Sequence, residues 1–162
     1  MNRIMRNLLL SALLIAGAPI AHADLDVGQN IPRFDIERLE GGTLRSGELD
    51  DKVVMVMFWA TWCPICLHEL PAFQKLYETY RKQGLEIVAL SLDREKGEVV
   101  DFWRQRKYAF PVAMRMPGMR EAYGDIKGTP TLFLFDRKGQ LRLKHLGGIE
   151  IEDLERRLRQ LL

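Results

Sequence analysis

The sequence predicts an α/β fold in which a mixed sheet carries helices on both faces. Two continuous apolar runs of strand length, Val53–Trp59 and residues 85–92, are each followed by a segment of helical periodicity. This is the pattern of a βαβ unit, whose strands are parallel. Nearer the C-terminus, two apolar segments flank a turn at residues 136–139, which predicts an antiparallel hairpin. Both kinds of pairing in one sheet make the sheet mixed.

The N-terminal half of the predicted fold begins, after a polar lead, with a β-hairpin. Residues 34–39 and 43–45 flank the pair Gly41-Gly42, which suits a tight turn. The run Val53–Trp59 has the unbroken hydrophobicity of a strand buried on both faces. A helix is expected next, over residues 64–82, and Gly84 closes it.

The C-terminal half is expected to alternate short helices with short strands. The helices show apolar residues at helical spacing, and the strands are short apolar or alternating runs. We predict helices at residues 96–107, 119–123 and 151–162, and strands at residues 85–92, 110–113, 131–135 and 140–146. The last helix is amphipathic. No internal repeat or linker interrupts residues 24–162, so one domain is expected there.

Residues 1–23 have the features of a secretory signal peptide. Arg3 and Arg6 precede an apolar stretch at residues 8–18, and Ala21-His22-Ala23 forms a cleavage site of the A-x-A type. Cleavage leaves Asp24 as the first residue of a periplasmic, or otherwise extracytoplasmic, protein. An uncleaved anchor is the rival interpretation, but the apolar run is shorter than the ~17 to 25 residues of a spanning helix.

The charge of the mature chain excludes several classes of partner. Removing the signal subtracts two of the 24 basic residues and none of the 22 acidic ones, which leaves 22 of each and a formal net charge of zero. Nucleic acids and strongly anionic surfaces are therefore poor partners. We expect a monomer.

Both cysteines of the chain lie in one Cys-x-x-Cys motif, at Cys63 and Cys66, between a predicted strand and a predicted helix. Unpaired backbone N–H groups at a helix start favour the thiolate of Cys63, so Cys63 is expected to be the nucleophile and Cys66 the resolving thiol. Pro64 is tolerated at a first helical position. Zinc needs about four ligands, and the only histidines of the mature chain, His68 and His145, are distant in sequence. A redox dithiol with no metal and no cofactor is therefore predicted.

The chain resembles the exported TlpA- and ResA-like thiol:disulfide oxidoreductases of the thioredoxin superfamily. Three segments carry the resemblance, which runs from about Gly28 to the C-terminus: Phe-Trp-Ala-Thr-Trp-Cys-Pro-Ile-Cys at residues 58–66, Glu-Leu-Pro at 69–71, and Gly-Thr-Pro-Thr-Leu-Phe-Leu-Phe-Asp at 128–136. The resemblance implies a thioredoxin-like three-layer sandwich with an N-terminal β-hairpin. It also implies that Thr129-Pro130 is a cis-proline loop beside the cysteines, where the Thr129 backbone pairs with the substrate. Trp62, Pro64 and Ile65 are expected to contact the substrate as well.

Two acidic residues are candidates for proton transfer at the dithiol. Glu69 falls on the apolar stripe of the predicted helix, where it is either a partly buried acid near the sulfurs or a structural acid that reaches a surface base. Thioredoxins proper have a buried acid where this chain has Met57. Asp93, at the end of the second buried strand, is the nearest analogue by topology, although it equally suits a cap of the next helix.

The resemblance favours reduction of partner disulfides, for example in apocytochrome c or a copper-site protein, with electrons from a membrane donor. Oxidation of exported proteins is the alternative within the same chemistry. A copper-binding or chaperone module is the alternative from another class, because Met114, Met116 and Met119 lie close together in sequence and thioethers bind Cu(I). A peroxiredoxin is disfavoured, since Thr61 stands two residues before Cys63 where that family has a Pro-x-x-x-Thr-x-x-Cys motif.

Overall fold

The structure is a computed structural model that describes residues 24–162. The signal peptide predicted at residues 1–23 lies outside the described residues. In chain order the elements are β1 (Ile36–Glu37), β2 (Thr43–Leu44), the 3-10 turn η1 (Ser46–Leu49), β3 (Val53–Trp59), α1 (Pro64–Tyr80), η2 (Arg81–Gln83), β4 (Leu85–Ser91), α2 (Lys96–Arg106), β5 (Val112–Met114), α3 (Met119–Tyr123), β6 (Thr131–Phe135), β7 (Leu141–Leu146) and α4 (Ile151–Leu161). Within the described residues no helix has the length and hydrophobicity needed to cross a membrane.

The central sheet has five strands in the order β5-β4-β3-β6-β7, and β1 pairs with β2 in a separate hairpin. The pairs β3–β4 and β4–β5 are parallel, whereas β3–β6 and β6–β7 are antiparallel. The sheet is therefore mixed, and the predicted thioredoxin-like fold with its N-terminal hairpin is confirmed. Because β3 and β4 run in parallel, their carboxyl ends meet at one edge of the sheet, at Trp59 and Ser91.

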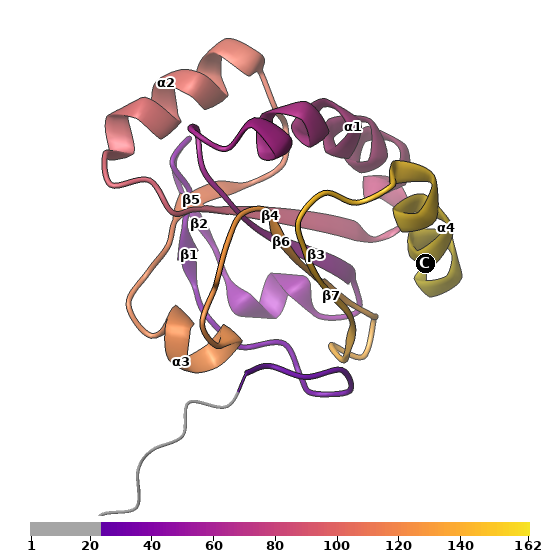
Figure 1. Cartoon of the computed structure of the whole chain (residues 1–162). Helices are drawn as coiled ribbons and strands as arrows, with labels where there is room; N and C mark the ends of the chain where they lie inside the picture. The colour runs from indigo at the N-terminus through magenta and orange to yellow at the C-terminus, as the bar shows by residue number, and fades with distance from the viewer. Residues whose placement is uncertain (1–23) are drawn as a thin grey trace, which may run out of the picture.

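The two faces of the sheet are covered differently (Figure 1). The helices α1, α2 and α4 pack on one face, where Met55, Met57 and Trp59 of β3 contribute to the core. The short helix α3 and the β1–β2 hairpin cover the other face. Val56 and Phe58 of β3 point to that face and belong to its core, called here the second core. The alternation explains why β3 is apolar at every position: its side chains point in turn into two cores.

An N-terminal extension of the sheet was not expected from the polar lead of the sequence. Gly28 N–H donates to the carbonyl of Leu141 at 2.8 Å, Leu141 N–H donates to that of Gln29 at 2.8 Å, and Ile31 N–H donates to that of Gly139 at 2.7 Å. Leu25 is buried in the second core. Residues 28–31 are thereby held along the start of β7, next to the β6–β7 turn.

Candidate active site

The two cysteines lie at the junction between β3 and α1. Cys63 is the N-cap residue of α1, Pro64 is its first helical residue, and Cys66 lies within its first turn. The two form a disulfide with a Cα–Cα distance of 5.3 Å. The N–H of Cys66 donates to Cys63 Sγ at 3.2 Å, so the Cys63 sulfur occupies the position of a capping acceptor. The helix start thus presents its positive end to this sulfur.

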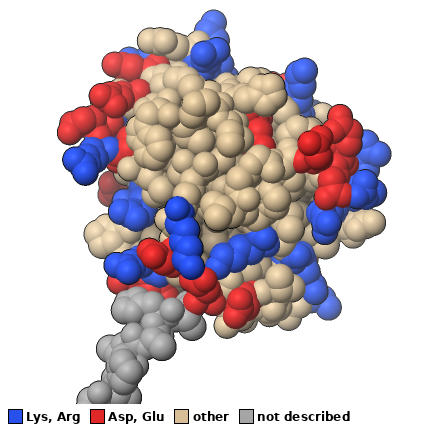
Figure 2. Space-filling model, viewed as in Figure 1, with Lys and Arg blue, Asp and Glu red and all other residues tan. Residues whose placement is uncertain are grey.

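The disulfide lies beneath exposed apolar side chains. Cys63 is 4% exposed and Cys66 is fully buried, while Trp62 and Ile65, each of which directly precedes one of the cysteines, are 66% and 48% exposed. Leu146, at the end of β7, is 57% exposed. Figure 2 shows that the middle of the face seen in Figure 1 is uncharged and that charged side chains gather at its margins. Large apolar side chains exposed around a buried disulfide are typical of a protein-binding surface.

The loop before β6 lies at the same end of the sheet as the disulfide. The peptide bond Thr129–Pro130 is cis, as the resemblance implies. Phe58 pairs with Thr131 in the antiparallel β3–β6 ladder, so Pro130, one residue before Thr131, lies beside the end of β3. The disulfide loop begins at this end of β3. The carbonyl of Pro130 accepts the N–H of Gly147 at 2.8 Å, which ties this loop to the end of β7. The backbone of Thr129 has no such bond among the described backbone pairs.

Asp93 is buried and holds the disulfide loop. Its carboxylate accepts the N–H of Thr61 at 3.0 Å, the hydroxyl of Thr61 at 2.6 Å and the hydroxyl of Ser91 at 2.6 Å. Thr61 lies two residues before Cys63, so Asp93 fixes the chain just ahead of the nucleophile candidate. Neither Thr61 nor Ser91 was predicted as a site residue, because a threonine or serine has no sequence signal until its partner is placed beside it.

Glu69 is buried one helical turn after Cys66, on the stripe where the sequence placed it. Its Oε1 accepts the N–H of Ile149 at 2.6 Å, which connects α1 to the loop before α4. Its Oε2 is buried and has no hydrogen-bond partner among the described residues. Burial raises the pKa of this carboxyl, while the Ile149 N–H and the nearby His145 and His68 act in the opposite direction. The structure therefore shows a buried acid and no surface base bonded to it.

The methionines do not converge on one site. Met114 packs against the core beneath α1 and α2, whereas Met116 and Met119 pack against the core on the other face of the sheet. Each fills an apolar gap, as flexible thioethers commonly do. No group of three or more His, Cys, Asp or Glu residues within residues 24–162 is arranged to hold a metal ion. The Nε2 of His145 contacts the carbonyl of Gly148 at 2.8 Å.

With the geometry in place, comparison with known proteins decides the family. The family model described as AhpC/TSA matches residues 27–144. The chain belongs to the AhpC/TSA family. A thiol-disulfide oxidoreductase ResA from Bacillus thuringiensis subsp. konkukian is 34% identical over 138 residues, which cover 85% of this chain and 79% of the relative. The chain is thus a thiol–disulfide oxidoreductase of the ResA type, and the resemblance stated from its motifs is confirmed.

Solved structures agree with this membership. A protein from Chlorobium tepidum, provisionally assigned as a thiol:disulfide interchange protein DsbE, is 32% identical and has a TM-score of 0.77; the match covers 85% of this chain and 99% of that one. A secreted disulfide oxidoreductase from Mycobacterium tuberculosis shares the fold, with 18% identity, a TM-score of 0.68 and coverage of 80% and 96%. The Cys63–Cys66 disulfide is the Cys-x-x-Cys disulfide of this chain.

Proposed function

We propose that this oxidoreductase is exported and reduces disulfides in partner proteins, with Cys63 as the nucleophile and Cys66 as the resolving thiol. The observation that carries the assignment is the position of Cys63 Sγ as the capping acceptor at the start of α1. This position stabilises negative charge on the Cys63 sulfur. Cys66 lies deeper, so a bulky disulfide reaches it less readily.

The proposed reaction takes two steps. The Cys63 thiolate attacks one sulfur of the partner disulfide, forms a mixed disulfide and releases the other sulfur as a thiolate. The Cys66 thiolate then attacks Cys63 Sγ, which forms the internal disulfide and releases the second partner thiolate. Two electrons have passed to the partner, and the Cys66 proton has gone to a base. A membrane electron donor is proposed to return the electrons.

The exposed residues around the disulfide supply the proposed contacts with the partner. Trp62 and Ile65 offer apolar surface on either side of Cys63, and Pro64 lies between them. The free backbone of Thr129, held beside the disulfide by Pro130, is proposed to pair with an extended partner segment in the manner of a strand. The export signal at residues 1–23 and the extracytoplasmic location are part of the same proposal. Apocytochrome c and copper-site proteins are the proposed class of partner.

Trapping tests the division of labour between the cysteines. We expect Cys66→Ser to accumulate mixed disulfides with partner proteins, because attack by Cys63 proceeds and resolution is blocked. Cys63→Ser is expected to trap at least about tenfold less, since the remaining thiol is buried. Non-reducing gels of extracts from cells that express each variant measure the two yields. Equal yields from both variants would rule out the assigned roles.

A further inference from the structure

A groove runs between α1 and α4 and begins at the disulfide loop. Its first part is a 400 Å³ pocket with Ile65, His68 and Glu69 on the α1 side and the residues around Gly148 and Ile149 on the other. Its second part is a 360 Å³ pocket further along the same two helices. The two pockets share the lining residues Ala72, Ile151 and Glu152, so they form one continuous groove.

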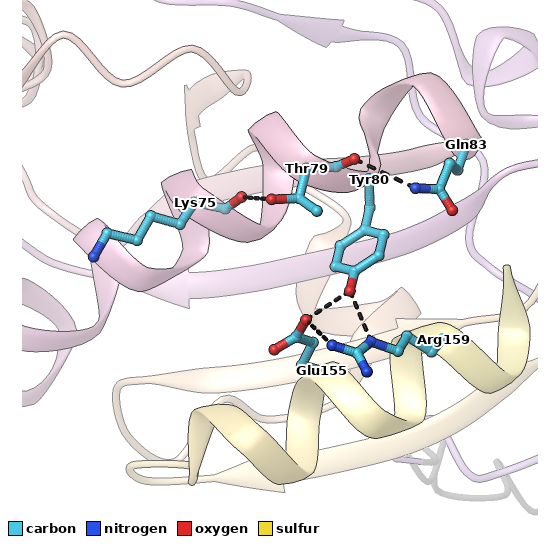
Figure 3. A network of polar contacts seen from close by, with 6 residues as sticks. All are labelled: Lys75, Thr79, Tyr80, Gln83, Glu155 and Arg159. Carbon is cyan, nitrogen blue, oxygen red and sulfur yellow. Dashed lines mark hydrogen bonds and ion pairs between the residues drawn. The ribbon is translucent and has the colours of Figure 1, made fainter.

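Near the far end of the groove a polar clasp joins the two helices, drawn in Figure 3. Tyr80, the last residue of α1, reaches α4, where its hydroxyl donates to Glu155 Oε1 at 2.6 Å and accepts the Arg159 Nε–H at 2.8 Å. Thr79 and Glu155 line the groove just before this clasp. The groove therefore leads from the side of the clasp to Ile65, next to the disulfide.

The end of the groove near the disulfide is acidic. Glu150 and Glu152 are exposed on its α4 side, and neither carboxylate has an ion pair or hydrogen bond among residues 24–162. Glu69 lines the same pocket, is 4% exposed and has an unpartnered Oε2. The only Lys or Arg of the two linings, Lys75, lies in the far part, whereas His68 lies in the near part with the acids. Glu155, also in the far part, is already paired with Arg159.

The lining between these acids is apolar. Ala72, Leu76 and Ile151 form it, and Ile65 stands at the entrance. An apolar channel with carboxylates at its rim suits the side chain of lysine or arginine, whose aliphatic stem packs on apolar surface while the charged head binds carboxylates.

We propose that the groove between α1 and α4 binds a lysine or arginine side chain of the partner protein, in the segment next to the cysteine under attack. The proposal rests on the proposed function, because the groove is useful to a partner whose disulfide meets Cys63. It selects partners by charge: a disulfide flanked by basic residues is reduced faster than one flanked by neutral or acidic residues. Charge complementarity of this kind acts on encounter and orientation.

Acids at a helix start also stabilise the helix dipole, and Glu150 and Glu152 occupy the N-cap and first turn of α4. The chain contains a matched pair that separates the two effects. Glu95 and Glu98 are exposed and occupy the N-cap and first turn of α2, and they line neither pocket of the groove. Replacing either pair with glutamine removes two negative charges from the N-cap and first turn of a helix.

The test uses three synthetic peptides that share one internal disulfide and differ in two flanking residues, which are Arg, Gln or Glu. Second-order rate constants for their reduction by the reduced protein are measured by acid quench and chromatography. For the wild type we expect the Arg peptide to react about fivefold faster than the Gln peptide and the Glu peptide to react slowest. The preference should shrink in 0.5 M NaCl because salt screens exposed charges.

Two double variants show whether the preference for the Arg peptide comes from the groove or from the overall negative charge of the surface. Glu150→Gln/Glu152→Gln should lose most of the preference for Arg while reducing the Gln peptide at the wild-type rate, and Glu95→Gln/Glu98→Gln should keep the preference. Urea unfolding should show similar small losses of stability for both pairs. Equal loss of preference in both pairs, or no preference in the wild type, would overturn the groove proposal while leaving the proposed function intact. Failure of the wild type to reduce any of the peptides would instead overturn the proposed function.

Discussion

Glu69 and Asp93 are both buried carboxylates near the disulfide, but their surroundings suit them to different work. Asp93 accepts three hydrogen bonds from Thr61 and Ser91, so its oxygens are committed to holding the loop before Cys63. Glu69 has one bond, from Ile149, and a free Oε2 one turn from Cys66. A base must have a free oxygen to accept a proton. The geometry therefore favours Glu69 as the acceptor of the Cys66 proton and Asp93 as a positioning residue.

We predict that Glu69→Gln slows the resolving step by about tenfold or more and leaves the first attack by Cys63 near its wild-type rate. Asp93→Asn should slow both steps to a similar extent, because the whole loop loses its anchor. Single-turnover kinetics with a fluorescent mixed disulfide separate the two rates. If Asp93→Asn slows the resolving step alone and Glu69→Gln does not, Asp93 would be the proton acceptor, as its topology led us to expect.

Glu69 should also make stability depend on pH. Its pKa is raised above the reference value of 4.5 in the folded state, so the folded protein binds this proton more tightly than the unfolded chain. The contribution to stability is fully present below the unfolded pKa and is lost as pH rises through the folded pKa. We predict that the unfolding free energy of the wild type, minus that of Glu69→Gln, falls between pH 4 and pH 8. A pKa difference of one unit corresponds to about 1.4 kcal/mol.

Urea unfolding curves of both proteins in the oxidised form, measured at each pH, provide this difference. A difference between wild type and Glu69→Gln that stays constant from pH 4 to pH 8 would show that Glu69 has an ordinary pKa in the folded protein.

Among the elements, α1 and α4 are joined at both ends of the groove between them. Glu69 binds the loop before α4 at one end, and Tyr80 binds Glu155 and Arg159 at the other. The hydrogen bond from Tyr80 is the largest cause that lowers the pKa of Glu155, followed by the bond from Arg159. The two contacts fix the spacing of the helices, so they also fix the width of the groove.

We predict that Tyr80→Phe lowers the free energy of unfolding by about 1 kcal/mol, because Glu155 and Arg159 lose a partner that is itself buried. The midpoint of thermal unfolding should fall by roughly 2 to 4 °C. Tyr108→Phe is the matched control, since Tyr108 lies in the aromatic cluster with Trp103 and Phe110 and its hydroxyl has no hydrogen bond among the described residues. Calorimetry measures both. Equal losses in the two variants would show that the clasp adds nothing beyond the general effect of removing a tyrosine hydroxyl.

For the whole molecule, the sequence predicts the elements that are set by strong apolar patterns. Val53–Trp59 and Thr131–Phe135 have the predicted bounds, and α1 ends at Tyr80 with a 3-10 turn that Gly84 closes in the left-handed conformation, at φ 100°. The placement of Cys63 and Cys66 at a helix start follows from a motif whose chemistry is local. For these cysteines and for the elements above, neighbouring residues in the chain are enough to determine the structure. The placement of Pro130 beside the cysteines was expected only from the family resemblance.

The features that sequence reasoning missed depend on residues distant in the chain. Residues 28–30 are exposed and carry no apolar side chain, and Ile31 is half-buried. The segment joins the sheet through backbone bonds, which leave no pattern of side chains in the sequence. The contact between Thr61 and Asp93 requires the register of β3 and β4, which brings Trp59 opposite Ser91. The groove likewise exists only after α4 is placed beside α1. A local sequence pattern does not predict contacts of this kind, because each of the two contacting segments has an ordinary explanation in its own neighbourhood.

The attachment of residues 28–31 beside the β6–β7 turn has a practical consequence for anyone who handles the protein. Asp24, where the described chain begins, contacts Asp125 and Lys144, and in Figure 1 this end lies at the pole opposite the start of α1. A resin, electrode or fluorescent label coupled ahead of Asp24 would therefore face away from Cys63. Such a preparation should present its dithiol to the bulk solution with every molecule oriented alike. This suits thiol–disulfide exchange on a column and electrochemical measurement of the dithiol/disulfide couple.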